Sequence, residues 1–101
     1  MSTDNILEIV EFAAKEGCAV ENVVQGLKIL DKFYQGFDGY RGIKIAKSEQ
    51  DTWLLTLDWE SAQAEKEASV AMMKSPDTEL FKNIVNPKTV SKRLLARVLL
   101  D

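Results

Sequence analysis

One segment, residues 52–59, constrains the fold of this chain more than any other because it alternates strictly between apolar and mixed positions. It reads Thr-Trp-Leu-Leu-Thr-Leu-Asp-Trp, and all four odd-numbered positions are large and apolar. Alternation with period two places those side chains on one face of a β-strand. Residues 48–51 form a polar turn before it, and residues 40–47 precede that turn. The sequence therefore predicts a hairpin of two strands, 40–47 and 52–59.

The segments on either side of this hairpin predict two more strands and two helical regions. Residues 6–15 and 90–100 are rich in β-branched and aliphatic types and indicate the first and last strands. Apolar residues recur every three or four positions across residues 20–37, which indicates an amphipathic helix. Ser61 is the predicted N-cap of a second helix, which breaks at Ser75-Pro76. This β-α-β-β-α-β order predicts an α+β ferredoxin-like fold, a four-stranded antiparallel sheet with helices on one face.

Length and composition favour a single small domain, 1–101, in a reducing compartment. The chain has 101 residues, of which 46% are hydrophobic, and no apolar run approaches the roughly 20 residues of a membrane span. Its 13 basic and 16 acidic residues give no basic patch for nucleic acid or an anionic membrane. One cysteine and no histidine exclude an internal disulfide and imidazole metal ligands. We therefore expect a cytoplasmic protein.

Both faces of the predicted sheet carry large apolar residues, although helices cover only one of them. In the first strand Leu7 and Phe12 point to different faces of the sheet. In the last strand Leu95 and Leu99 point to one face and the other apolar residues to the other. A second copy of the chain, packed sheet against sheet, is the simplest cover, so we expect a homodimer with an apolar pocket. An aspartate at Phe12 or Leu99 should then disturb dimerisation or folding, because the charge would have no counter-ion.

Three short motifs accompany this order of elements. They are Gly36-Phe37-Asp38-Gly39, Leu57-Asp58-Trp59-Glu60-Ser61, and Ser75-Pro76 followed by Leu80-Phe81-Lys82. With them the chain resembles, over nearly its whole length, the antibiotic biosynthesis monooxygenase (ABM) domains of the dimeric α+β barrel superfamily. The resemblance implies a homodimer with a pocket between each sheet and its helices or partner. Members oxidise polycyclic aromatics without a bound cofactor, degrade haem, act on small metabolites, or have no assigned activity.

The resemblance also bears on individual positions. The haem-degrading branch has an asparagine in the first strand, a tryptophan in the second helix and a histidine after the Phe-Lys pair. The corresponding positions hold Val10, Ala68 and Val85, which are all apolar. Haem iron needs an axial ligand from the protein, so these residues argue against haem degradation and we expect no cofactor. Together with Phe12 and Trp59, we expect them to line an apolar small-molecule pocket.

A cofactor-free oxygenase needs a base that converts a phenol-like substrate into an anion, within an apolar site. Glu8, Glu11 and Asp58 are the carboxylates that the predicted strands offer. Burial would raise their pKa toward a useful range, which makes them the candidate catalytic residues. The competing interpretation places them on solvent-facing or edge positions. Cys18 is better explained as a small buried hydrophobe than as a nucleophile, because no histidine is present to activate it.

Two further families share this topology and fit less well. RNA-recognition motifs need exposed aromatics within a basic signature, which is missing from this acidic chain. Val24-Gln25-Gly26-Leu27 faintly resembles the phosphate loop of acylphosphatases, but no arginine follows, and we expect Gly26 to let the helix approach the sheet.

Two functions therefore remain open. The first is a monooxygenase acting on a small aromatic or carbonyl metabolite, and similarity over the whole chain favours it. The second is a non-catalytic dimeric module that binds a small ligand or a protein, and the missing histidine and asparagine favour it.

Overall fold

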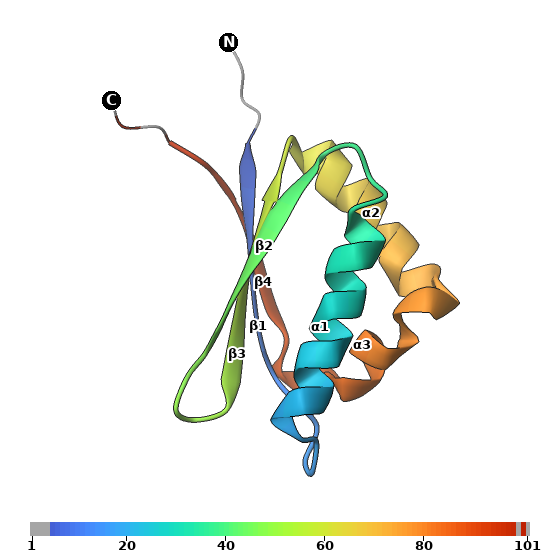
Figure 1. Cartoon of the computed structure of the whole chain (residues 1–101). Coiled ribbons are helices and arrows are strands. Elements are labelled where there is room, and N and C mark those ends of the chain that lie inside the picture. Colours follow the sequence, from blue (N-terminus) through green and yellow to red (C-terminus); the bar gives the residue numbers. More distant parts are fainter. Residues whose placement is uncertain (1–4, 99, 101) are drawn as a thin grey trace.

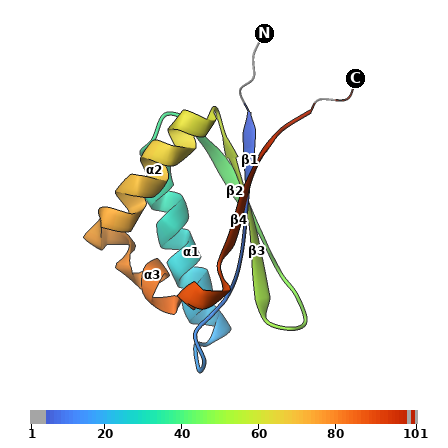
Figure 2. The ribbon, with the colours of Figure 1, turned by 180° about the vertical axis from the view of Figure 1, so that it is seen from behind.

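The computed structural model describes residues 5–98 and 100, and its four strands form one antiparallel sheet. The strands are β1 (Ile6–Ala13), β2 (Tyr40–Lys47), β3 (Thr52–Trp59) and β4 (Ser91–Ala96), in the order β2-β3-β1-β4. All three neighbouring pairs are antiparallel. Figures 1 and 2 show every labelled helix on the same side of the sheet. The predicted ferredoxin-like topology, with helices on one face, is confirmed.

Three helices cover that face. They are α1 (Val20–Tyr34), α2 (Ala62–Lys74) and α3 (Glu79–Ile84), with a short 3-10 turn before α3 and another before β4. Helix α2 begins where predicted, because the Ser61 hydroxyl accepts a hydrogen bond from the Ala64 N–H at 3.1 Å. It ends at the predicted break, with Ser75 as its C-cap and Pro76 in the first turn of the next element.

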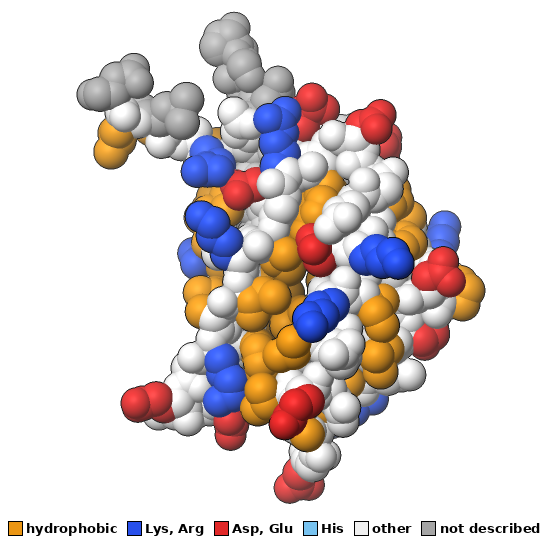
Figure 3. Space-filling model, viewed as in Figure 1, with side chains coloured by type: hydrophobic (Ala, Val, Ile, Leu, Met, Phe, Trp, Pro, Cys, Tyr) orange, Lys and Arg blue, Asp and Glu red, His pale blue; other side chains and the backbone are white. Residues whose placement is uncertain are grey.

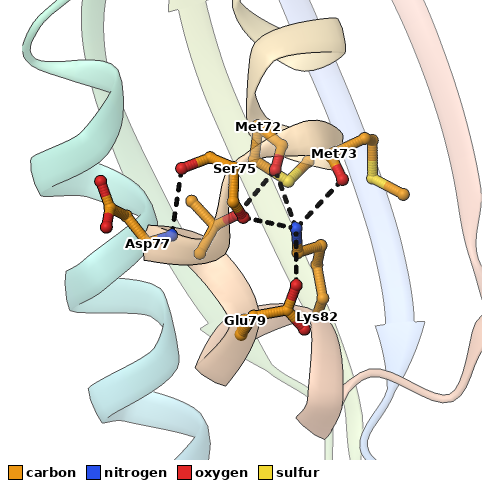
Figure 4. Close-up of polar contacts among 7 residues, drawn as sticks. Met72, Met73, Ser75, Asp77, Glu79 and Lys82 are labelled. Atoms are coloured by element: carbon orange, nitrogen blue, oxygen red, sulfur yellow. Dashed lines mark hydrogen bonds and ion pairs between the residues drawn. The ribbon is translucent and has the colours of Figure 1, made fainter.

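A lysine of α3 stabilises the C-terminal end of α2. The Lys82 ammonium donates to the carbonyl oxygens of Met72, Met73 and Ser75 at 3.1, 3.1 and 2.8 Å, as Figure 4 shows. It also pairs with Glu79 at 3.3 Å. The Met72 carbonyl also accepts from the Ser75 N–H and the Thr78 hydroxyl, and the Ser75 carbonyl accepts from that same hydroxyl. The ammonium adds to these bonds at the end of α2 and ties α2 to α3.

The core lies between the sheet and the helices. The odd-numbered side chains of β3, from Trp53 to Trp59, are all buried, as their alternation predicts. Because Glu8 lies opposite Leu57 and Phe12 opposite Trp53, the even-numbered residues of β1 share this inner face. The core residues that the helices contribute are Val23, Leu27, Leu30, Tyr34, Ala68, Phe81 and Ile84.

Three elements have bounds that differ from the sequence prediction. Strand β1 ends at Ala13 instead of residue 15, and α1 ends at Tyr34 instead of residue 37, where a turn begins. Strand β4 spans residues 91–96 instead of 90–100. Within the described part of the chain it is an edge strand that pairs only with β1, and its last pair is Ala96 with Ile6, the first residue of β1. The pairing of β4 therefore stops where its neighbour begins.

Gly26 permits a close contact, but with α3 and not with the sheet as predicted. A Cβ atom built at Gly26 would lie 2.9 Å from Ile84 Cδ1 and 3.2 Å from the Phe81 Cα. Both distances are shorter than side-chain contacts normally allow. The missing side chain thus lets α1 and α3 pack directly against each other.

The outer face of the sheet carries an apolar centre that no described helix covers. Leu7, Ile9 and Leu54 are half-buried there, and Leu95 is 42% exposed. Phe12 lies instead on the inner face and is only 1% exposed, so an aspartate there would disrupt the core. Leu99 lies outside the described residues.

On the side of the molecule seen in Figure 3, hydrophobic side chains run along the middle, with acidic and basic groups scattered on both sides. None of the described helices is long and apolar enough to cross a membrane.

Candidate functional site

A cavity of about 180 Å³ lies between the inner face of the sheet and the helices. Its polar lining residues are Glu8, Tyr34, Ser69 and Lys92. The rest of the wall is apolar and comprises Val10, Leu30, Leu55, Leu57, Met72, Met73 and Phe81. An apolar cavity with a few polar groups converging on it is the usual form of a small-molecule site.

A second compartment of about 220 Å³ adjoins the first and shares Val10, Met73 and Phe81 with it. Its other lining residues are Phe12, Lys15, Lys82, Val85, Pro87 and Val90. The two compartments therefore offer a polar end at β1 and β4, and a more apolar end near α3. Because Lys82 and Met73 belong to the contact that joins α2 to α3, that contact also fixes part of the wall.

Glu8 is the central polar group of this site. Its side chain is almost fully buried, and the Trp59 indole Nε1–H donates to its Oε1 at 2.8 Å. The Lys92 ammonium lies 3.6 Å from the other oxygen, Oε2, and also pairs with the buried carboxylate of Glu65. Two buried carboxylates thus share one ammonium group, which leaves the cluster one negative charge in excess if both are ionised.

This arrangement shifts the pKa of two of its members. Burial raises the pKa of the Glu8 carboxyl above its ordinary value, although Lys92 and the Trp59 N–H both act to lower it. Burial alone would lower the pKa of Lys92, but its hydrogen bond to Glu65 and the charges of both carboxylates raise it overall. Lys92 therefore stays charged, while Glu8 can take up a proton closer to neutral pH than an exposed carboxyl does.

Tyr34 adds a hydroxyl to the cavity wall. It is 2% exposed, and burial raises its pKa, with smaller contributions from the charges of Glu8 and Glu65. The phenol is therefore a protonated hydrogen-bond donor at neutral pH. Its ring packs edge-on against the indole of Trp59, with the two centroids 4.9 Å apart.

Of the five residues predicted to line a pocket, Val10, Phe12 and Trp59 lie on the inner face of the sheet, Ala68 lies in α2, and Val85 follows α3. Val10, Phe12 and Val85 line the two compartments. Trp59 contacts the site through its hydrogen bond to the carboxylate described above. Ala68 has no exposed surface and belongs to the core.

The structure places the three candidate bases on different faces of the sheet, one inside and two outside. Glu8 is on the inner face and lines the cavity. Glu11 is an odd-numbered residue of β1, so its side chain lies on the outer face, where it is exposed. Asp58 is also on the outer face, where its carboxylate accepts a hydrogen bond from Arg97 at 2.5 Å. The structure therefore brings only Glu8, of the three, to the cavity.

Sequence reasoning missed Lys92, Glu65 and Tyr34 as members of the site. A signal was present for two of them. Glu65 lies three residues before Ala68 and seven before Met72, which places a carboxylate on the inward stripe of α2. Lys92 lies two residues before Leu94, so it shares the inward side of the last strand. A charged residue on each of two inward faces predicts a buried ion pair.

Other parts of the surface make weaker candidates. A larger hollow of about 460 Å³ lies between residues 36–39 and the N-terminal end of α2, but its acidic lining residues Asp38, Glu60 and Glu67 are all exposed. Among residues 5–98 and 100, no group of three or more histidine, cysteine, aspartate or glutamate side chains is placed to hold a metal ion.

The sequence matches no family model, and no curated protein is similar to it at a significant level. Solved structures, however, have the same fold. SnoaB, a cofactor-independent oxygenase from Streptomyces nogalater, superimposes with a TM-score of 0.74 at 11% identity, covering 96% of each chain. A candidate antibiotic biosynthesis monooxygenase from Bordetella bronchiseptica gives a TM-score of 0.79 at 15% identity, covering 95% of this chain and 99% of that one.

A third structure, Rv0793 from Mycobacterium tuberculosis, gives a TM-score of 0.70 at 17% identity and covers 95% of this chain and 97% of that one. The coverage shows that the similarity extends over one whole domain. At identities this low it establishes the fold, which is the fold of ABM proteins. The activity has to be argued from the site itself.

Proposed function

We propose that this protein is a cofactor-independent oxygenase acting on a small apolar molecule with an acidic hydroxyl group, such as a phenol or an enol. The observation that carries the proposal is the placement of Glu8, a buried carboxylate with a raised pKa on the wall of an apolar cavity. The fold shared with a cofactor-independent oxygenase supports it.

In the proposed reaction Glu8 first accepts the proton of the substrate hydroxyl. The resulting oxyanion is electron-rich and transfers an electron to O₂, and a C–O bond then forms at a carbon that carries hydrogen. Protonated Glu8 returns its proton to the peroxide. Loss of water breaks the O–O bond and leaves a carbonyl group on that carbon. One oxygen atom enters the product, the other leaves as water, and all four electrons come from the substrate.

The surroundings of Glu8 suit this chemistry. The apolar wall excludes water from the anion, which would otherwise be stabilised and made less reactive by solvation. The Tyr34 hydroxyl, the Ser69 hydroxyl and the Lys92 ammonium are donors on the cavity wall available to a substrate oxygen. Trp59 and Lys92 hold the carboxylate in one orientation, so that its geometry is set before the substrate binds.

Oxygen uptake with hydroquinone- and anthrone-type probes tests the assignment. A positioned base contributes about 10²–10⁴-fold to a rate, so Glu8→Gln should lower kcat/KM by that amount. Glu11→Gln is the matched control, because it makes the same change on the outer face of the same strand. Equal turnover by the wild type and Glu8→Gln would remove Glu8 as the base.

The second candidate function is a non-catalytic module that binds a small ligand. It is favoured by the existing partners of Glu8, which already accepts a hydrogen bond from the Trp59 N–H and pairs with Lys92. Each compartment is also smaller than the roughly 300–1,000 Å³ of typical ligand pockets. Saturable quenching of tryptophan fluorescence by the same probes, without oxygen uptake, would identify this function.

We also propose that the protein is a homodimer joined through the outer faces of two sheets. The proposal is supported by the apolar centre formed there by Leu7, Ile9, Leu54 and Leu95, which is suited to sheet-on-sheet packing. Ile9→Asp should convert a dimer to monomers in light scattering after gel filtration. Val70→Asp, at an exposed position of α2, is the control and should leave the mass unchanged.

A further inference from the structure

We propose that Tyr40 is a redox-active site, which supplies one electron through Trp59 to an oxygen-centred radical formed in the cavity. The inference rests on the proposed oxygenase function for its oxidant. It concerns a group outside the cavity, since Tyr40 does not line either compartment. Tyr40 is the first residue of β2 and is half-buried, so it lies between the core and the surface.

Two aromatic rings, those of Tyr34 and Trp59, connect the cavity with Tyr40. Tyr34, on the cavity wall, has its centroid 4.9 Å from that of Trp59, and the Trp59 centroid is 5.1 Å from that of Tyr40. The two tyrosine rings are themselves 5.5 Å apart. Electron tunnelling slows exponentially with distance, and rings in van der Waals contact exchange electrons without that penalty. The contacts thus form a continuous path between the oxygen chemistry and the surface.

Trp59 and Tyr40 each donate a hydrogen bond to a carboxylate that can accept the proton. The Tyr40 hydroxyl donates to Asp31 Oδ1 at 2.6 Å, and the Trp59 indole N–H donates to Glu8 at 2.8 Å. Gln35 holds the other Asp31 oxygen at 3.0 Å. An oxidised phenol or indole is a strong acid. Electron loss can therefore be coupled to proton movement along an existing hydrogen bond, and no net charge accumulates in the core.

The same contacts set the direction of transfer. In the described part of the chain, the Tyr34 hydroxyl has no hydrogen-bond partner that could take its proton. Oxidation at Tyr34 is therefore less favourable than at Tyr40, whose phenol is bonded to Asp31. If Tyr34 or Trp59 is oxidised, an electron from Tyr40 should reduce it, so that the radical is finally located on Tyr40. There a thiol or another reductant in solution can restore the electron, and Asp31 returns the proton.

The overall step balances in atoms and charge. When superoxide escapes before the C–O bond forms, the substrate radical adds a second O₂ and becomes a peroxyl radical. This radical gains one electron from Trp59 and a proton from protonated Glu8, and becomes a hydroperoxide. Trp59 regains its electron from Tyr40, whose proton passes to Asp31. The products are the hydroperoxide, the Tyr40 phenoxyl radical, ionised Glu8 and protonated Asp31. The path would spare Met72 and Met73, which form part of the cavity wall and are readily oxidised to sulfoxides.

Flash photoionisation of the indoles in the intact protein tests the path without substrate or oxygen. The chain has only two tyrosines and two tryptophans, so each radical can be assigned by substitution. We expect the indolyl absorption to decay as the phenoxyl absorption grows. Tyr40→Phe keeps the ring and should lose most of the phenoxyl signal, whereas Tyr34→Phe should retain it. Trp59→Phe should also lose it. Trp53→Phe, whose ring makes no aromatic contact among the described residues, should not.

Asp31→Asn is the second, independent variant. It preserves the shape of the side chain but removes the proton acceptor, so phenoxyl formation should slow. An unchanged phenoxyl yield in Tyr40→Phe or in Trp59→Phe would overturn the proposal. Because neither O₂ nor substrate is present, this outcome is separate from the oxygen-uptake result. A working radical path in a protein without oxygenase activity would refute the proposed function alone.

Discussion

Replacing Glu8 with glutamine should make the protein more stable at neutral pH, although it removes the proposed catalytic base. Glutamine has nearly the same shape, and its carbonyl oxygen can still accept the hydrogen bond of the Trp59 indole. What disappears is a buried negative charge. Burial is the largest contribution to the raised pKa of Glu8 and outweighs the opposing effect of Lys92, so ionised Glu8 destabilises the fold.

The sign and size of the effect follow from linkage. A group whose pKa is higher in the folded state adds stability below its unfolded pKa, here the ordinary value of 4.5, and this contribution is lost as pH rises through the folded pKa. Between these two values, Glu8 should lower the free energy of unfolding by up to about 1.4 kcal/mol per pH unit. The attraction of Lys92, 3.6 Å away, is already included in this net effect, because the raised pKa is the balance of burial against that charge.

Urea unfolding of the wild type and Glu8→Gln from mildly acidic to neutral pH measures this effect. The difference between their free energies of unfolding isolates Glu8, because every other titrating group is present in both. We expect the difference to grow in favour of Glu8→Gln as pH rises. Glu11→Gln, on the exposed outer face, should show no comparable trend. A difference that stays constant with pH, or that favours the wild type increasingly at neutral pH, would refute the reasoning.

Three further substitutions test the packing around the site, each by urea unfolding. Gly26→Ala should destabilise the protein by about 1–3 kcal/mol despite the better helix propensity of alanine, because the new Cβ would lie 2.9 Å from Ile84 Cδ1. Gly36→Ala is the control and should be tolerated, because the nearest atom to its Cβ would be 3.4 Å away. Ser61→Ala should lower stability by about 1 kcal/mol through loss of the N-cap of α2. Lys82→Met should lower it by about 1–3 kcal/mol, because the Met73 carbonyl loses its donor, whereas the Met72 and Ser75 carbonyls keep the Thr78 hydroxyl. An unchanged value would show that water replaces the ammonium.

The strands and helices could be predicted because their patterns are local. The alternation in residues 52–59 and the cap at Ser61 both reappear in the structure at the predicted positions. The end of β4 could not be predicted in this way, since residues 90–100 continue the same apolar pattern. The last pair of that strand joins Ala96 to Ile6, the first residue of β1, which is its only neighbour among residues 5–98 and 100. A strand boundary of this kind depends on pairing between segments far apart in the sequence.

The residues of the candidate site could be predicted only in part from the sequence. Glu8 and Glu11 are equally plausible bases in the sequence, and the phase of β1 relative to β3 decides between them. Lys92 and Glu65 come from β4 and α2, and their shared ion pair exists only once both elements pack against β1. The contact of Gly26 with α3, which sequence reasoning assigned to the sheet, likewise depends on how two helices meet.

The sequence by itself determined the order of strands and helices, the cap of α2 at Ser61, its break at Ser75-Pro76 and the inward face of β3, because hydrophobic periodicity and capping act between residues a few positions apart. Only the tertiary structure decided which carboxylate faces the cavity, which lysine neutralises it and which aromatic rings touch. Those outcomes depend on register and on helix packing, which bring together side chains as distant as Glu8, Trp59 and Lys92.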